Sequence, residues 1–247
     1  MSALAYALTL VSLLPTILNF NGSFITVIAE QNELDKKAEI FNDLISMVIY
    51  IGFGVTAFML MAGQSIVQLV LEHGAFTEDN TVSVARAISA YAWMIVPIFL
   101  ISLLDQVFQV EQRIGFMVRR TVLGLLTNAF LSALFLFGMG WGLFGVALAT
   151  SISYWVMLLS GLAGLKNVGY PLEKRKHLRW GAWNAPALLL AYIVFASLPA
   201  PFNSSLGGVS AAIFLVGGAM LLAGLSWRGR EQQLIISTVR RCLPRKS

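Results

Sequence analysis

The sequence predicts an all-α fold, a polytopic membrane bundle of about seven transmembrane helices. Hydrophobic residues make up 57% of the 247 residues, charged residues make up 12%, and the mean hydropathy is +0.77. Seven apolar runs recur, each about as long as the ~20 residues that a helix needs to cross ~30 Å of hydrocarbon. Soluble helices must instead present a polar face to water. The predicted spans are residues 4–28, 44–71, 82–110, 121–137, 141–165, 180–198 and 209–227, which form one membrane domain over residues 1–227.

The first span, residues 4–28, is interrupted by Pro15 and then by Asn19, Asn21 and Gly22. Helix-breaking residues are tolerated inside a bundle where neighbouring helices or water satisfy the freed carbonyl groups. Broken helices often flank the substrate cavities of secondary transporters. We therefore interpret this span as a broken helix near a cavity, with an ordinary kink as the alternative.

Two spans in the middle of the chain contain isolated polar side chains. The third span, residues 82–110, holds Asp105, the one acidic residue well inside a predicted span. The fourth span, residues 121–137, holds Asn128 near its middle. A polar group in hydrocarbon needs a partner or a cavity, so both positions are candidates for function.

The fifth and seventh spans are rich in small residues. Glycine and alanine recur in residues 141–165 and 209–227, where they allow helix backbones to approach closely, which is a packing signal. Residues 228–247 follow as a basic tail. Its apolar residues suit a short amphipathic helix on the inner leaflet.

The basic residues predict the orientation of the chain in the membrane. Sixteen of the 17 lysines and arginines lie on alternate breaks or in the tail, and Arg86 is the exception. The positive-inside rule places these basic segments, including the C-terminus, in the cytoplasm. Seven spans then put the N-terminus outside. Since a chain that starts outside in apolar sequence is expected to lack an odd number of upstream spans, we interpret it as the C-terminal part of a larger transporter.

Several other classes of function are disfavoured by the sequence. The net charge of +5 and the pI near 9.6 are explained by topology and contacts with anionic membrane lipids, so we expect no nucleic-acid partner. The sequence contains no Walker-type loop and a single cysteine, Cys242. Two distant histidines form no metal motif, and no catalytic constellation is present. We therefore expect no enzyme activity, metal or cofactor.

The break after the second span carries a recognisable motif. Residues 64–81 read QSIVQLVLEHGAFTEDNT, and residues 140–155 read GWGLFGVALATSISYW. Both segments resemble the MurJ/MviN family, the lipid II flippases of the multidrug/oligosaccharidyl-lipid/polysaccharide exporter superfamily. The resemblance covers nearly the whole chain. Supporting matches are Tyr91-Ala92, Pro97 and Phe108, Asn128, and Ala5-Tyr6-Ala7 followed by Pro15.

The resemblance implies the second lobe, plus two extra helices, of a fourteen-helix fold like that of MurJ and the multidrug exporters. The seven spans would be helices eight to fourteen, and the cytoplasmic C-terminus of the family agrees with the charge pattern. The chain departs from the family at Thr9, where the family usually has an arginine that faces a central cavity. The segment from Phe108 to Gly115 also differs, and the first half of the family fold is absent.

Asp105 is the main candidate for ion coupling. Gln109 and Gln112 follow at i+4 and i+7, so we expect the three to share one helix face that leads to Arg113. This face would line a cavity in which Asp105 binds a coupling cation or a proton. The alternative is a carboxylate that is hydrated or paired with Arg113 or Arg119.

The other candidates for the substrate cavity are uncharged. Asn19 and Asn21 offer amide donors and acceptors to a sugar or pyrophosphate, and Thr9 occupies the family's arginine position. Asn128, beside Thr127, either lines the cavity or forms an interhelical hydrogen bond. Outside this set, Arg86 is expected to pair with Glu78 and Asp79 or to meet an anionic headgroup.

These features favour a flippase for a polyprenyl-pyrophosphate-linked saccharide such as lipid II, working by alternating access in the bacterial inner membrane. The expected partners are the lipid-linked substrate, membrane lipids and the N-terminal half of the transporter. The first alternative is an exporter of a lipid-linked exopolysaccharide or O-antigen unit. This alternative is favoured because Thr9 stands where the family usually has an arginine. The second is a membrane remnant or scaffold subunit that does not transport.

Overall fold

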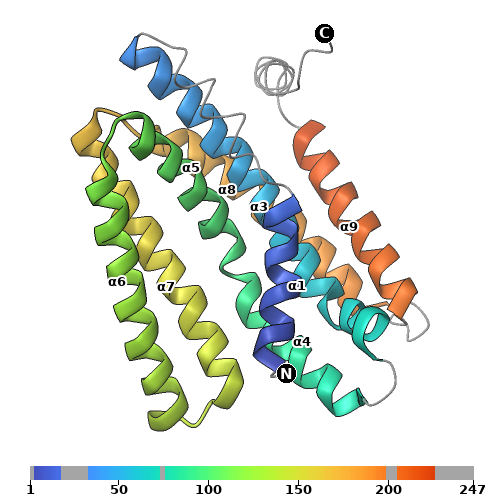
Figure 1. Ribbon diagram of the computed structural model, residues 1–247. Coiled ribbons are helices and arrows are strands. Elements are labelled where there is room, and N and C mark those ends of the chain that lie inside the picture. Colours follow the sequence, from blue (N-terminus) through green and yellow to red (C-terminus); the bar gives the residue numbers. More distant parts are fainter. Residues whose placement is uncertain (1–2, 18–32, 73–75, 199–204, 226–247) are drawn as a thin grey trace, which may run out of the picture.

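The chain is an α-helical membrane bundle. The computed structural model describes residues 3–17, 33–72, 76–198 and 205–225, and every regular element in those ranges is helical. Asn19, Asn21 and the basic tail lie outside the described residues. The helices, shown in Figure 1, are α1 (Ala3–Ile17), α3 (Leu34–Leu71), α4 (Glu78–Ala92), α5 (Ile95–Val110), α6 (Ile114–Ala133), α7 (Gly142–Leu165), α8 (Lys174–Ala196) and α9 (Ser205–Leu225).

Among the described residues, three segments are long and apolar enough to cross a membrane, namely Asp35–Leu71, Ile114–Gly138 and Gly142–Val168. The pair α4–α5 adds a fourth if it is counted as one bent span. Shorter apolar helices lie at Ala3–Leu13, Ala185–Ala196 and Leu206–Leu221. Each of the seven predicted spans thus contains helix in its described part, although α3 and α6 begin earlier than the hydropathy predicts.

Helix α3 is the central element of the bundle. It packs against α4, α5, α8 and α9, and its N-terminal end projects beyond its neighbours (Figure 1). A large core cluster around Phe41, Leu44 and Phe108 joins α3 to α5. A smaller cluster, including Met61 and Leu188, joins the other end of α3 to α8 and α9. One long helix therefore connects the parts of the bundle.

The predicted span 82–110 consists of two helices. Helices α4 and α5 meet at Trp93 and Met94 with a bend of 44°. Pro97 lies in the first turn of α5, where a missing N–H is tolerated, but it cannot donate to the carbonyl of Trp93 four residues earlier. The Nε1 of Trp155 donates to that carbonyl instead, at 2.9 Å. A break that costs a backbone hydrogen bond is thus compensated by α7.

Two further carbonyl groups at the break accept hydrogen bonds from side chains of other helices. The hydroxyl of Ser151 donates to the carbonyl of Ala90 at 2.6 Å, and the hydroxyl of Thr56 donates to that of Ala92 at 3.3 Å. Backbone polar groups in a membrane need internal partners. Side chains of α3 and α7 therefore stabilise the bend.

Helices α6 and α7 form a closely packed hairpin. A Cβ atom on Gly124 would lie 2.3 Å from both Cγ and Sδ of Met157, so a larger residue there would force the Met157 side chain to move. A π-helical turn, Leu134–Gly138, ends α6, and Gly140 and Gly142 have positive φ in the connection. The outer face of α6 is apolar and exposed, as at Leu125 (67%) and Phe130 (67%). This face suits contact with lipid or another helix.

Candidate functional site

Thr9 lies on an exposed face of α1. Its hydroxyl donates to the carbonyl of Ala5 at 2.8 Å, within the same helix. A hydroxyl bonded in this way still has acceptor capacity for a ligand. Because Asn19 and Asn21 lie outside the described residues, Thr9 is the candidate of the first span that the structure places.

Asp105 forms an ion pair with Arg120, which lies on α6. The distance between Arg120 Nη2 and Asp105 Oδ1 is 2.5 Å, and the two side chains are 3% and 26% exposed. Arg113 and Arg119, the partners considered from the sequence, are exposed. Arg120 and Gly124 are the buried residues of α6, and their i,i+4 spacing places both on the face toward α7.

The pocket around Arg120 depends on a glycine of α7. A Cβ on Gly161 would lie 2.9 Å from Leu104 Cδ1 and 3.3 Å from Arg120 Cδ. The Nε and Nη1 atoms of Arg120 are buried and have no hydrogen-bond partner among the described residues. A buried guanidinium with one carboxylate partner carries a desolvation cost, so this pair is sensitive to any change in the charge of Asp105.

The polar face predicted from Asp105 to Gln112 is only partly formed. Gln109 is exposed on α5, one helical turn from Asp105. The inclusion of Gln112 is wrong, because α5 ends at Val110 and Gln112 has a φ of 54°, outside helical geometry. The turn into α6 therefore shortens the polar face to Asp105 and Gln109.

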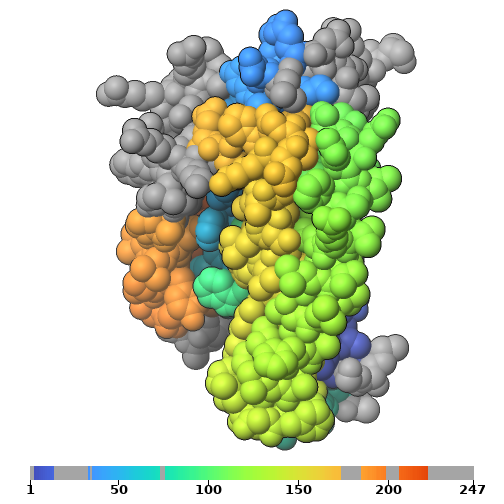
Figure 2. All heavy atoms as spheres, turned by 90° about the vertical axis from the view of Figure 1, so that its left-hand side faces the viewer, coloured from blue at the N-terminus to red at the C-terminus, as the bar shows by residue number. Residues whose placement is uncertain are grey.

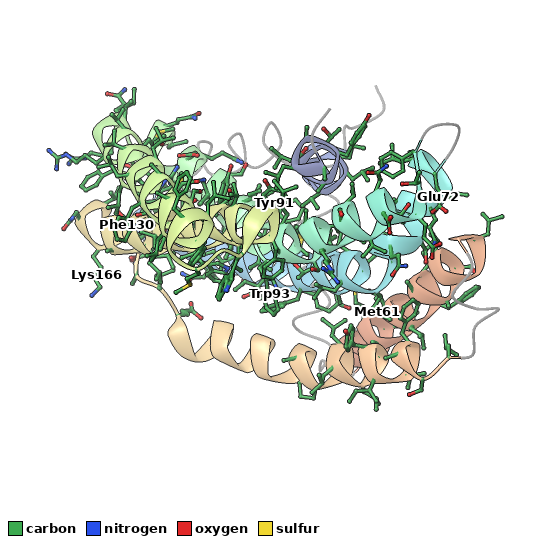
Figure 3. The ribbon with its side chains drawn as sticks, turned by 90° about the horizontal axis from the view of Figure 1, so that it is seen from below. Met61, Glu72, Tyr91, Trp93, Phe130 and Lys166 are labelled. Carbon is green, nitrogen blue, oxygen red and sulfur yellow. The ribbon has the colours of Figure 1, made fainter. Side chains whose placement is uncertain are left out.

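Asn128 connects α6 to α7. Its Nδ2 donates to the hydroxyl of Thr150 at 3.2 Å, and the hydroxyl of Ser132 donates to its Oδ1 at 2.9 Å. The hydroxyl of Thr150 donates in turn to the carbonyl of Val146 at 3.1 Å, and Figure 3 shows Tyr91 of α4 near α7. The interhelical hydrogen bond expected as the alternative is therefore present, and it extends into a polar cluster.

A second polar cluster lies at the end of the bundle where the basic breaks meet. Lys37 Nζ lies 3.2 Å from Glu111 Oε1, and the Tyr170 hydroxyl donates to the same oxygen at 2.9 Å. Asn42 Nδ2 donates to the carbonyl of Pro171 at 2.9 Å, and Asn42 Oδ1 accepts from the amide of Glu173 at 3.0 Å. We call this set, Lys37, Asn42, Glu111, Tyr170 and residues 171–173, the basic-end junction.

The basic-end junction ties three breaks of the sequence to each other. Burial raises the pKa of Tyr170, and the hydrogen bond and negative charge of Glu111 raise it further. Sequence reasoning missed this cluster, because Lys37 is one of the basic residues that indicate topology and Glu111 follows the predicted span 82–110. The signal that was available is a carboxylate directly after an apolar span, which needs a partner near the membrane surface.

These clusters consist of hydrogen-bonding groups and ion pairs. In the part of the chain that the structure describes, no group of three or more His, Cys, Asp or Glu side chains is placed to hold a metal ion. The clusters offer amides, hydroxyls and two partly buried ion pairs, Asp105–Arg120 and Lys37–Glu111. Such groups can orient a polar ligand or stabilise one arrangement of helices.

Comparisons with known proteins agree on one family. The family model of the lipid II flippase MurJ matches residues 1–203. A solved structure, "Lipid II flippase MurJ, inward closed conformation", has a TM-score of 0.73 and 20% sequence identity, and the match covers 90% of this chain and 46% of that chain. The chain thus spans less than half of that solved protein. A search of curated proteins found no match.

These findings agree with the hairpin motif at residues 64–81 and with the helical architecture. The family model covers most of the chain, and the likeness in fold extends over nearly all of it. The chain therefore belongs to the lipid II flippase MurJ family.

Proposed function

We propose that this chain is one lobe of a flippase that moves a polyprenyl-pyrophosphate-linked saccharide, such as lipid II, across the bacterial inner membrane. The observation that carries the proposal is the correspondence of 90% of the chain with a solved lipid II flippase at a TM-score of 0.73. Because the chain covers 46% of that protein, a complete transport path requires a second lobe. The N-terminal half, in the same polypeptide or as a separate chain, would supply it.

Alternating access gives the basic-end junction and the Asp105–Arg120 pair distinct roles in this proposal. The basic-end junction would hold the cytoplasmic ends of α3, α5 and the α7–α8 loop together. The Asp105–Arg120 pair would respond to a proton or a cation, because charge at Asp105 determines whether buried Arg120 is compensated. The exposed residues Thr9 and Gln109 would contact the polar headgroup, as would Asn19 and Asn21.

A related substrate is the second candidate. The described part of α1 contains no charged residue, and Thr9 presents an uncharged hydroxyl. A cavity wall without a basic residue attracts a pyrophosphate less strongly. A lipid-linked exopolysaccharide or O-antigen unit would then be moved in place of lipid II.

The proposal is tested in cells depleted of their own lipid II flippase. We expect this chain to restore growth when it is co-expressed with its N-terminal half, and the two to co-purify. Rescue of a strain that lacks its O-antigen exporter, without rescue of the lipid II strain, would favour the second candidate. Co-purification without rescue of either strain would indicate a scaffold subunit, and a failure to co-purify would oppose the two-lobe proposal.

A further inference from the structure

A cavity of about 510 Å³ lies between α3, α4 and α8. Figure 3 shows Met61 and Trp93 on the side of α3 and α4 that faces α8, whereas α1 lies on the opposite side of this layer. Figure 2 shows that the surface is hollowed between α8 and α7. The residues that argue for a ligand here are Gln64, Arg86, Ser89, Tyr192, Phe195 and Ala196, all of which line the cavity.

One end of the cavity is cationic. Arg86 is exposed, and among the described residues its guanidinium forms no ion pair. Neither Glu78 nor Asp79, the partners considered from the sequence, pairs with it in this part of the chain. The side chain of Gln64 lies in the same wall and offers a further donor, whereas the hydroxyl of Ser89 already donates to the carbonyl of Arg86 at 2.7 Å. The group suits a phosphate.

The wall formed by α8 is apolar. Tyr192 is 47% exposed on α8, and Phe195 is half-buried one turn further along the helix. Trp93, at the break between α4 and α5, is 52% exposed and lies toward the same groove (Figure 3). An aromatic surface beside a single cation has the amphipathic character of a lipid-binding site.

The position of the cavity along the bundle indicates which leaflet of the membrane it opens to. Arg86 is the one basic residue that the sequence places near an outward break. Ala196, which lines the cavity, is the last residue of α8 before the other long outward break. Under the orientation of the proposed function, the cation therefore lies in the outer half of the membrane.

We propose that this cavity binds an anionic phospholipid of the outer leaflet, with its phosphate at Arg86 and Gln64 and an acyl chain along Tyr192 and Phe195 toward Trp93. The proposal rests on the orientation given under the proposed function. It differs from that function because the ligand is a resident lipid on the side of the α3–α4 layer opposite α1, and it is not cargo. The unpaired charge of Arg86 selects an anionic headgroup over a zwitterionic one.

The test measures quenching of tryptophan fluorescence by dibrominated lipids in nanodiscs that contain the full chain. We expect dibrominated phosphatidylglycerol to quench the Trp93-dependent signal at a mole fraction about fivefold lower than dibrominated phosphatidylcholine, as one basic residue near the surface predicts. Trp93→Phe identifies that signal by removing it. Arg86→Gln should abolish the preference, whereas Arg119→Gln, the same charge change on an exposed residue of α6, should retain it.

Further variants and competitors keep the outcome decisive. If Arg86→Gln does not fold, Ala196→Leu provides a second test. The larger side chain lies at an exposed position of α8, narrows the cavity and should weaken the quenching of tryptophan fluorescence. An equal preference in the wild type and Arg86→Gln would overturn the proposal. Displacement by glycerol phosphate alone would show a site for phosphate and not for a lipid. Stronger displacement by a polyprenyl phosphate would assign the groove to transported cargo, which contradicts this proposal but leaves the proposed function intact.

Discussion

The ion pair between Asp105 and Arg120 is the residue-scale feature with the largest expected effect on stability. Replacing Asp105 with Asn leaves a guanidinium that is 3% exposed without its counter-charge. Removing one partner of a buried pair is strongly destabilising. Because Asp105 itself is 26% exposed, we expect a loss of about 2–4 kcal/mol, somewhat below that of a fully buried pair.

The measurement is the free energy of unfolding in detergent micelles. Asp105→Asn combined with Arg120→Gln should lose less stability than the sum of the two single changes, since the double variant removes the uncompensated charge. Additive losses would show that the two residues do not interact. If the double variant is stable but inactive in transport, the Asp105–Arg120 pair has a role in transport beyond its structural one.

The environment of Tyr170 predicts that the stability of the folded protein decreases at alkaline pH. Its pKa is raised above the ordinary 10.0 by burial and by Glu111, so folding favours the neutral phenol. The stability from this group is fully present below pH 10 and is lost as the pH rises through the higher pKa of the folded state. Tyr170→Phe should cost about 1 kcal/mol at neutral pH through the lost hydrogen bond to Glu111.

The same substitution should reduce the loss of stability at alkaline pH. Melting temperatures of the wild type and Tyr170→Phe, measured between about pH 8 and 12, are expected to converge at the alkaline end. The other tyrosines contribute equally to both proteins and cancel in the difference. Parallel curves over this range would contradict the expected role of Tyr170.

At the scale of elements, the bend between α4 and α5 depends on side chains of other helices. Ser151→Ala removes the donor to the carbonyl of Ala90 and should cost about 0.5–1.5 kcal/mol, as for interhelical hydrogen bonds in membranes. Ser153 is a matched control, since it is also buried but donates within α7 to the carbonyl of Thr150. Thermal unfolding should show a larger loss for Ser151→Ala than for Ser153→Ala, and equal losses would argue against a role at the bend.

The α6–α7 hairpin depends on the absence of a side chain at Gly124. Gly124→Ala places a Cβ 2.3 Å from Met157 Cγ, so we expect a loss of about 1–3 kcal/mol from overpacking. Gly115→Ala on the same helix meets no atom within 4 Å and should be neutral or slightly stabilising. Urea unfolding gives the ratio of folded to unfolded protein for each variant. Similar ratios for the two variants would show that the close approach of α6 and α7 at Gly124 is not required.

The sequence predicts the elements of this fold better than their ends. Hydropathy locates each apolar run, because length and composition alone decide whether a helix can cross the membrane. It misses the earlier start of α3, since Lys37 and Asn42 are polar residues stabilised by the α7–α8 loop and Glu111. It also predicts one helix over residues 82–110, although Pro97 indicated the position of the bend.

The candidate sites were less predictable because they depend on contacts distant in the sequence. The sequence indicates that Asp105 needs a partner and offers Arg113 or Arg119, but the observed partner is Arg120, which the packing of α5 against α6 brings close. The i,i+4 spacing of Arg120 and Gly124 was a local signal for that face. The hydrogen bonds of Tyr170 and Asn42 carry no comparable local signature.

At the scale of the whole molecule, the chain presents the architecture of one lobe. It matches 46% of the solved flippase, and the exposed apolar face of α6 offers a surface for lipid or a second lobe. The basic-end junction gathers three breaks at one end of the bundle, whereas the cavity at Arg86 lies near the other end. The two ends of the bundle thus differ in their polar groups, which supports the alternating access proposed for this chain.

The most direct test of the two-lobe proposal is the movement of fluorescent lipid II across proteoliposomes that contain this chain and its N-terminal half. A membrane-impermeant reductant bleaches only the headgroups on the outer leaflet, so transport raises the fraction bleached above that of empty vesicles. The proposal predicts a raised fraction for the assembled halves and a smaller one for a version with Asp105→Asn. Bleaching equal to that of empty vesicles, from a complex shown to be folded and assembled, would contradict it.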